Sequence, residues 1–295
     1  MIPFPNISPE IFSFSIGGFE LALRWYAISY IMGFILAVVI MRFFLKRDHL
    51  WKFRTAPFDL DQVDSLITYL ILGVIVGGRA GYVLFYNLQF YLENPVDILR
   101  VWDGGMSFHG GFLGVVIAGY FFCKFNGIPI LSGADLIAIS SPPGLFLGRV
   151  ANFINAELWG RPTDFVLGVI FPGMRAQDCP DIIGVCARHP SQLYEAVLEG
   201  IVLLGILMFL ALRGFFKKPG FITGVFIFGY GISRYFVEFF READAQFVTP
   251  DNQNGYVLFL GEFGVSMGQL LSMPMIFVGL IIISLTLSKK GKVNV

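Results

Sequence analysis

Four arginines stand within long apolar segments or at their ends, where a positive charge needs an explanation: Arg24, Arg79, Arg149 and Arg234. An arginine inside a membrane helix costs about 2.5–3.5 kcal/mol on insertion scales, so it needs a partner or a function. The guanidinium binds phosphate through a planar, bidentate fork and stays charged in a low dielectric. Arg149 and Arg234 end on the same side of two different segments, and together they predict an anion site suited to phosphate.

Polar residues surround Arg149 in the stretch GRVANFINAELWGR. Asn152 lies three residues after Arg149, so the two share one face of a helix. Glu157 could orient an arginine or receive a proton. The alternative is that this stretch is an anchor in the lipid headgroup region, for which Trp159 and Arg161 would be suitable.

The stretch YGISRYFVEFFREAD places a polar stripe on an otherwise aromatic segment. At 100° per residue, Tyr230, Arg234 and Arg241 lie within about 40° of one another on a helix. Glu238 follows Arg234 at i+4, so the simple alternative is an ion pair that holds the bundle together. That pair explains one arginine but not the stripe, which must face protein or water.

A histidine with neutral-pH chemistry lies in GGMSFHGGFLG. His109 is a candidate general base because imidazole titrates near neutral pH, and the alternative is a structural histidine hydrogen-bonded to a neighbour. Ser107 raises the alternative of an intramembrane serine protease, but a GxSxG turn is absent. Tyr26, near the end of the first apolar segment, is either a substrate contact or an ordinary aromatic belt residue.

The composition predicts the elements that must carry these residues. Of 295 residues, 56% are hydrophobic and only 14% are charged, and the mean hydropathy is +0.71. Repeated apolar runs near 20 residues indicate an all-α polytopic membrane protein, with 1–295 as a single integral membrane domain. We expect seven transmembrane helices, at 21–41, 66–89, 108–123, 132–149, 194–212, 221–240 and 264–287.

The lysines predict the orientation, since they all fall in alternate loops and in the C-terminal tail, which should be cytoplasmic. The N-terminus is then outside, with 1–20 as an interfacial amphipathic segment rather than a signal peptide. The remaining loops, at 90–107, 150–193 and 241–263, are extracytoplasmic, and we expect them to form a small head there.

Two further features bear on local structure. Pro142 and Pro143 interrupt the fourth segment, and broken helices at membrane depth usually line a cavity. The stretch HPSQLYEA reads as a helix start, with Gln192 able to cap it and Glu195 facing the bundle.

Other classes of site find little support. There is no P-loop, no GxGxxG after a strand and no HExxH, and the three histidines lack metal-ligand spacing. We therefore expect no metal, no nucleotide or redox cofactor, and no nucleic-acid partner. Cys179 and Cys186 are either a disulfide, if their loop faces an oxidising compartment, or two free thiols. A transporter for an anionic lipid would use the same arginines, but the inverted repeats it predicts are not evident.

These stretches, in the same order along the chain, resemble the bacterial prolipoprotein diacylglyceryl transferases. The resemblance runs from the second apolar segment to the last, and GR-x-x-NFIN-x-ELWGR is its most specific part. Ala151 and Ala156 stand where glycine is common in the family, which should not alter the chemistry.

The resemblance implies a defined reaction. The diacylglyceryl group of phosphatidylglycerol passes to the lipobox cysteine thiol in the signal peptide of a prolipoprotein, forming a thioether and releasing glycerol phosphate. It implies a bacterial cytoplasmic (inner) membrane protein, with its active site toward the extracytoplasmic side and with membrane lipid around it. The catalytic residues it implies are His109, Arg149, Arg234, Tyr230 and Glu157, with Tyr230 as the alternative base to His109. The substrate-binding residues it implies are Tyr26, Asn152, Gly160, Glu238 and Arg241.

Overall fold

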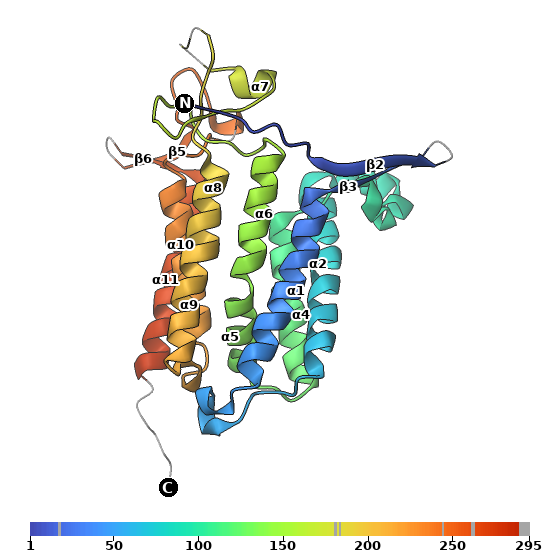
Figure 1. The fold of residues 1–295 in the computed structure, drawn as a ribbon, viewed down its shortest axis with the longest axis vertical. Coiled ribbons are helices and arrows are strands. Elements are labelled where there is room, and N and C mark those ends of the chain that lie inside the picture. Colours follow the sequence, from blue (N-terminus) through green and yellow to red (C-terminus); the bar gives the residue numbers. More distant parts are fainter. Residues whose placement is uncertain (17–18, 180–181, 183, 244, 261–262, 289–295) are drawn as a thin grey trace.

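The computed structural model describes residues 1–288, except 17–18, 180–181, 183, 244 and 261–262. Its main body is a bundle of helices aligned with the long axis (Figure 1). The helices are α1 (Trp25–Leu45), α2 (Gln62–Tyr86), α3 (Leu88–Glu93), α4 (Phe108–Phe125), α5 (Ile130–Ser140), α6 (Pro142–Ile154), α7 (Met174–Gln177), α8 (Ser191–Glu195), α9 (Leu203–Leu212), α10 (Phe221–Val237) and α11 (Met267–Ser288). A π-helical segment, η5 (Ala196–Val202), joins α8 to α9, and short 3-10 turns lie at Asp48–Leu50, Lys52–Arg54, Pro95–Leu99, Val101–Asp103, Phe215–Lys217 and Ala245–Phe247.

Within the described residues, six helical stretches are long and apolar enough to cross a membrane: α1, α2, α4, α5 with α6, α8 to α9, and α11. The remaining predicted segment, α10, has 17 residues and is shorter than these. The chain is therefore a mostly helical, multi-pass membrane protein.

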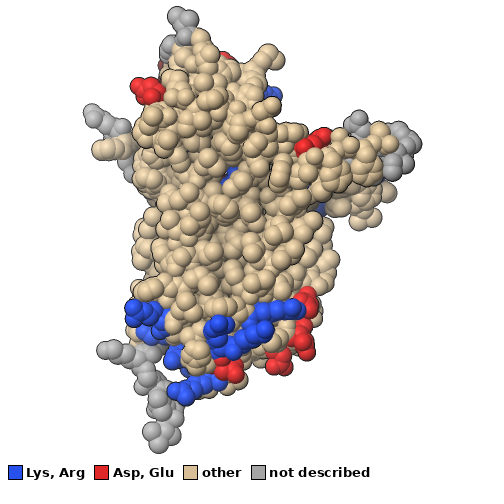
Figure 2. Space-filling model, viewed as in Figure 1, with Lys and Arg blue, Asp and Glu red and all other residues tan. Residues whose placement is uncertain are grey.

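On the face shown in Figure 2, the surface of the bundle between its two ends is almost free of charged side chains. Charged side chains gather at the end where α1 gives way to α2, and there Arg42 pairs with Asp64 at 2.8 Å. Lys46, Lys52 and Lys124 are exposed. The tail lysines lie outside the described residues.

Glycines decide how closely α2 and α4 pack. Gly73, Gly77 and Gly81 on α2 face Gly110 and Gly114 on α4, and a Cβ atom added to Gly81 would lie 2.8 Å from the Cα of Gly110. Small residues let helix backbones approach in lipid, where dispersion contacts stabilise the pair. This packing holds the end of α4 that carries His109 against α2.

The break expected in the fourth segment is confirmed. α5 ends at Ser140 and α6 begins at Pro142, where a proline lacks the N–H that would continue the hydrogen-bond ladder. α6 then continues to Ile154, beyond the predicted end of the segment at residue 149. Whether the break lines a cavity stays a prediction.

The N-terminal region was wrongly predicted as helix from residue 21. Phe19–Arg24 is a strand, β3, which pairs antiparallel with β2 (Glu10–Ile16), and α1 begins only at Trp25. Arg24 is consequently not buried in a helix: it is exposed and pairs with Glu10 at 3.2 Å. The hairpin extends sideways from the end of α1 (Figure 1). The segment 1–20 thus contains strands, and its place at a membrane surface stays a prediction.

A small head covers the same end of the bundle (Figure 1). β1 (Ile2–Pro3) pairs in parallel with β4 (Val169–Ile170), and β5 (Tyr256–Leu260) pairs antiparallel with β6 (Phe263–Ser266). Phe171, which follows β4, is fully buried against Phe4 and Phe153. Segments from the start, middle and end of the chain therefore build this head together.

Two ties hold the middle loop of the head. Cys179 and Cys186 form a disulfide, which decides between the two alternatives left by the sequence. Arg188, 2% exposed, donates to the carbonyl oxygens of Ala176 at 2.6 Å and Asp178 at 2.8 Å, and it pairs with Glu242 at 2.9 Å. Its guanidinium thus fixes the loop through backbone acceptors.

At the opposite end of the bundle, a buried carboxylate stabilises the start of α10. Asp135 on α5 accepts hydrogen bonds from the backbone N–H of Gly220 at 2.7 Å and of Thr223 at 2.8 Å. These donors are among the N–H groups that a helix start leaves without intrahelical partners. The contact fixes α10 relative to α5.

Candidate active site

Three arginines and three glutamates meet inside the bundle, where α6, the α8–η5 junction and α10 come together. Arg149 comes from α6, and Arg234 comes from α10. α6 can approach η5 because residue 200 is glycine: a Cβ atom there would lie 3.0 Å from the Cα of Phe146. We call this group the ion cluster, and its members are Arg149, Arg234, Arg241, Glu195, Glu199 and Glu238.

Glu195 is the centre of the ion cluster. One carboxylate oxygen lies 3.0 Å from Nη1 of Arg149, and the other pairs with Nη1 of Arg234 and lies 3.6 Å from Nη1 of Arg241. Its side chain is 1% exposed. A buried carboxylate is stable when cations and hydrogen bonds compensate its lost hydration, and Glu195 has three cations around it.

Glu199 and Glu238 complete the pairing. Oε2 of Glu199 lies 3.4 Å from Nη2 of Arg149, while its Oε1 is 3.9 Å from Nε of Arg234. Oε2 of Glu238 lies 3.4 Å from Nη2 of Arg234 and 3.5 Å from Nε of Arg241. The Arg234–Glu238 ion pair considered from the sequence therefore exists, but as one link in a larger cluster.

Tyr230 lies beside the ion cluster, as the stripe predicted. It is 9% exposed and within electrostatic reach of Glu199, Arg149 and Arg234. Arg149 and Arg234 each keep 16% of their side-chain surface exposed. The two arginines thus share carboxylates, and neither is sealed into a separate packing site.

Asn152 and Glu157 form a second polar group, one turn of α6 beyond Arg149. Nδ2 of Asn152 donates to Oε1 of Glu157 at 2.8 Å, and Nδ2 of Asn155 donates to the same oxygen at 3.3 Å. Glu157 and Asn155 line an open pocket of about 380 Å3, together with Arg24, Glu10, Pro9 and Ser8. Glu157 therefore orients no arginine of the ion cluster directly.

The start of α8 holds the 157–158 backbone in place. Ser191 donates to the carbonyl of Leu158 at 3.0 Å, and Nε2 of Gln192 donates to the carbonyl of Glu157 at 2.5 Å. Gln192 was expected to cap its own helix, which is wrong: it is fully buried and joins α8 to the 157–158 segment. That contact links the second polar group to the helix that carries Glu195.

Gly160 stands where three chain segments cross. Its N–H donates to the carbonyl of His189 at 2.8 Å, and it forms a bridge with Arg241. A Cβ atom there would lie 2.8 Å from the carbonyl oxygen of His189 and would overlap that of Phe240. Gly160 therefore aligns the segment that carries Arg241.

His189 is a half-buried structural histidine beside this crossing. Its Nδ1 lies 3.1 Å from the hydroxyl of Tyr194, and burial lowers the pKa of its imidazole. The ring is therefore neutral at neutral pH. Arg161 is not a free anchor either, since its Nε donates to the carbonyl of Arg241 at 2.9 Å.

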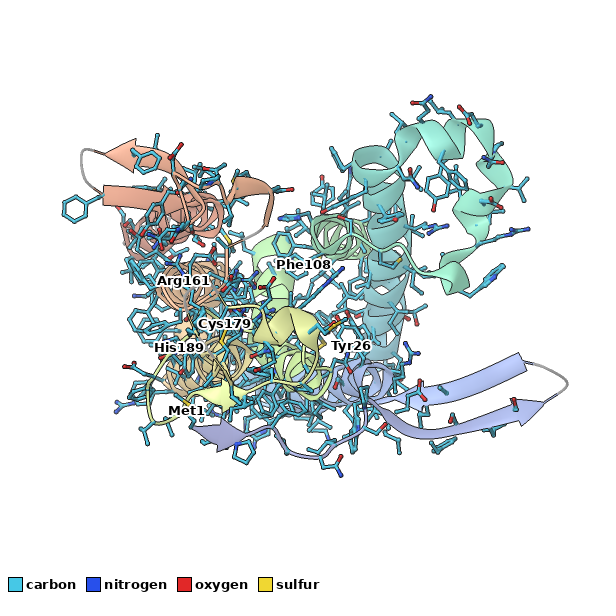
Figure 3. All side chains as sticks on the ribbon, turned by 90° about the horizontal axis from the view of Figure 1, so that it is seen from above. Met1, Tyr26, Phe108, Arg161, Cys179 and His189 are labelled. Atoms are coloured by element: carbon cyan, nitrogen blue, oxygen red, sulfur yellow. A yellow bond between two sulfur atoms is a disulfide. The ribbon has the colours of Figure 1, made fainter. Side chains whose placement is uncertain are left out.

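His109 and Tyr26 stand apart from the ion cluster. Both are exposed, and Tyr26 receives a hydrogen bond from Tyr30 at 3.4 Å, which is within electrostatic reach of Arg149. Seen from above, Tyr26 and Phe108 lie to the right of Arg161 and His189, which belong to the head (Figure 3). Among the hydrogen bonds and ion pairs of the described residues, none joins Tyr26 or His109 to the ion cluster. The ten catalytic and substrate-binding residues implied by the resemblance therefore lie in three places: in the ion cluster, at its rim, or, for His109 and Tyr26, outside both.

Ser107 has a structural contact rather than a catalytic one. Its hydroxyl caps α4 by accepting from the N–H of Gly110 at 3.2 Å. Among the hydrogen bonds of the described residues, none joins Ser107 to His109. The protease alternative therefore lacks its nucleophile–base pair.

The sequence interpretation missed Glu199. The available signal was its spacing: Glu195 and Glu199 are four residues apart in an apolar segment, so they share one helix face, and a buried carboxylate costs as much as a buried arginine.

An apolar bundle that encloses paired arginines and glutamates beside a tyrosine defines a class, a multi-pass membrane protein with a polar site among its helices. The sequence model of the family described as prolipoprotein diacylglyceryl transferase matches residues 12–285. This chain therefore belongs to the prolipoprotein diacylglyceryl transferase family, and it is a transferase.

Relatives similar to this chain carry the name phosphatidylglycerol–prolipoprotein diacylglyceryl transferase. One from Cereibacter sphaeroides is 58% identical over 280 residues, covering 95% of this chain and 96% of that protein. One from Ruegeria pomeroyi is 56% identical over 281 residues, covering 95% of each. One from Rhizobium meliloti is 46% identical over 281 residues, covering 95% of this chain and 92% of that protein. The resemblance seen in the motifs is thus confirmed.

Proposed function

We propose that this chain transfers the diacylglyceryl group of phosphatidylglycerol to the lipobox cysteine thiol of a prolipoprotein signal peptide. The observation that carries the proposal is that Arg149 and Arg234, from two different helices, share the carboxylates of Glu195 and Glu199. A phosphate can replace a carboxylate on a guanidinium, because both anions present paired oxygens. The ion cluster is in this proposal the phosphate site.

The reaction joins sulfur to carbon. The S–C bond forms, the C–O bond to the phosphate breaks, and glycerol phosphate leaves with the electron pair. Arg149 and Arg234 stabilise the negative charge that grows on the leaving phosphate, which is the kind of electrostatic stabilisation that contributes most in many enzymes. Glu238 holds Arg234 and Arg241 in place, and Glu238 and Arg241 contribute to substrate binding.

The thiol proton passes to His109. A cysteine has an unperturbed pKa near 8.5, so the attacking thiolate needs a base or a cationic field. His109 is exposed at the start of α4, so an arriving peptide can reach its imidazole. Tyr230 is the alternative base, and it lies closer to the arginines. Replacing His109 with glutamine should lower the rate about 100-fold or more, whereas an unchanged rate would move the role to Tyr230.

The remaining residues position the substrates. Asn152 and Glu157 hold each other at 2.8 Å beside the pocket below the N-terminal segment. Gly160 aligns the Arg241 segment, and Tyr26 contacts the lipid from α1. Glu157 also serves in proton transfer, since its second carboxylate oxygen remains available.

We infer that the chain spans the bacterial cytoplasmic (inner) membrane seven times, with α10 as the additional span. The charged end of the bundle then faces the cytoplasm, and the head, which includes 150–193 and 241–263, is extracytoplasmic. The segment 1–20 lies at the interface, and the whole chain forms one integral membrane domain. The band of charge at one end of an uncharged belt supports this orientation (Figure 2).

A peptide mass measurement tests the function. Purified protein is incubated with phosphatidylglycerol and a lipobox peptide, and the peptide should gain the mass of a diacylglyceryl group as glycerol phosphate appears. If glycerol phosphate forms while the peptide stays unmodified, the protein is a phospholipase and the transfer proposal is wrong.

A further inference from the structure

The charges of the ion cluster balance before any substrate is present. Its three guanidiniums and three carboxylates sum to zero when all are ionised, and no side chain among them is more than 17% exposed. A phosphodiester that binds there adds a negative charge without a counterion. In a buried site an uncompensated charge is far less stable than in water. The extra negative charge therefore favours protonation of one carboxylate in the site.

The three carboxylates are not equally well paired. Glu195 has all three arginines around it, and Glu238 accepts a hydrogen bond from Ser266 at 3.1 Å in addition to its two arginines. Glu199 is fully buried, and its Oε2 is 3.4 Å from both Nε and Nη2 of Arg149. Oε1 of Glu199 and Oε2 of Glu195 both lack a hydrogen bond, but Nη1 of Arg149 lies 3.0 Å from Oε2 of Glu195, whereas Nε of Arg234 is 3.9 Å from Oε1 of Glu199. Glu199 is therefore the least compensated of the three.

The charged and titratable groups facing Glu199 come from three neighbouring helices. α6 presents Arg149, and α10 presents Arg234 and Tyr230. α8 presents Glu195, whose negative charge repels that of Glu199. When the two arginines turn toward a phosphate, Glu199 loses its cations and keeps the repulsion from Glu195. Glu195 still has Arg241 nearby, at 3.6 Å.

We propose that Glu199 takes up one proton from the solvent when the phosphate of phosphatidylglycerol binds to Arg149 and Arg234. The lipid monoanion and one proton bind together, Glu199 becomes a neutral carboxylic acid, and no covalent bond changes. The charge of the site is thereby unchanged by binding. Glu199 acts through the arginines and is a positioning residue. The proposal rests on the proposed phosphate site.

Calorimetry counts the protons. Short-chain phosphatidylglycerol is titrated into the full-length protein in detergent, in buffers that differ in ionisation enthalpy. The wild type should take up about one proton per lipid bound, so its affinity should fall about tenfold per pH unit where free Glu199 is ionised. Glu199→Gln should bind the lipid with no proton uptake and with an affinity that does not depend on pH.

Glu242→Gln is the matched control. Glu242 is also paired with a buried arginine, Arg188 at 2.9 Å, but it lies outside the ion cluster. This variant should take up about one proton, as the wild type does. Infrared difference spectroscopy on the wild type should also show a new protonated carboxyl group on lipid binding, which keeps the test valid if Glu199→Gln fails to fold.

The outcomes separate this inference from the proposed function. Lipid binding without proton uptake by the wild type, or unchanged uptake by Glu199→Gln, would overturn the role of Glu199 and leave the phosphate site standing. Absence of any lipid binding by the wild type, or wild-type binding by Arg149→Gln, would overturn the phosphate site and the inference with it.

Discussion

Arg79 is buried and Arg149 largely so, with 16% of its side-chain surface exposed, but their partners differ in kind. Arg79 donates to four backbone carbonyls: Ile98 at 2.9 Å, Asp97 at 2.6 Å, Gly104 at 2.6 Å and Gly105 at 3.2 Å. Arg149 faces the side chains of Glu195 and Glu199, at 3.0 and 3.4 Å. Carbonyls belong to the backbone and cannot leave, whereas a carboxylate side chain can give way to another anion.

The difference teaches that burial alone does not identify a functional arginine. Arg79 and Arg188 each use most of their donors on carbonyl oxygens, so they fix loops. The arginines of the ion cluster are held by side chains, several at 3.4 Å or more. The kind of acceptor therefore separates an arginine that stabilises the fold from one that can bind a ligand.

The largest effect on the transfer rate should come from Arg149→Lys. Lysine keeps the charge that Glu195 and Glu199 need but lacks the planar fork, so transfer should fall about 100-fold or more while stability changes little. The measurements are the transfer rate to a lipobox peptide and the midpoint of thermal unfolding. Transfer within a few-fold of wild type would assign Arg149 to the same class as Arg79.

The same substitution at Arg79 should give the opposite result. A lysine at position 79 cannot reach all four carbonyls, and buried acceptors left unpaired should lower the free energy of unfolding by about 2 kcal/mol or more. Thermal unfolding of the variant in detergent measures this. A stability equal to that of Arg149→Lys would remove the distinction between the two regions.

A smaller effect is expected from Glu238→Gln. The amide keeps the shape and can still accept from Ser266, but it weakens the hold on Arg234 and Arg241. Transfer should fall about tenfold, which corresponds to about 1.4 kcal/mol, mainly through a raised KM for phosphatidylglycerol. A loss as large as that of Arg149→Lys would show that Glu238 contacts the reacting groups itself.

The smallest effect should follow opening of the disulfide. Cys179 and Cys186 close a short loop that Arg188 also holds, so Cys179→Ser with Cys186→Ser should cost about 2.5 kcal/mol at most. Transfer at low temperature should stay near the wild-type rate. A large loss of transfer would place this loop of the head in the substrate path.

Much of the ion cluster could be predicted, because its signals are local. Apolar length identified the helices, and helical periodicity placed Tyr230 and Arg234 on one face. The expectation that Arg241 continues this helical face is wrong, because α10 ends at Val237 and Arg241 forms a bridge with Gly160. Glu199 was not predicted, because the buried arginines indicate an anion site directly and their carboxylate partners only by implication. A buried arginine implies a buried acceptor, so the carboxylates of the neighbouring apolar segments should be considered with it.

The parts that could not be predicted depend on distant segments. The contact of Gly160 with His189 and Phe240 exists only after three segments have met. The strand β2 had a local signal, since Ser and Phe alternate in EIFSFSI, but the apolar content that follows it obscured where the helix begins. Hydropathy reports burial in lipid and does not distinguish a strand from a helix end.

The pairing of Ile2–Pro3 with Val169–Ile170 has a consequence for the order of assembly during synthesis. The early strand has no partner until the ribosome has produced residue 170, after the first four apolar stretches have already been made. The head must therefore be completed late. A protease that cleaves near Pro3 in nascent chains, but not in mature ones, would report the moment at which the N-terminal strand joins the rest of the head.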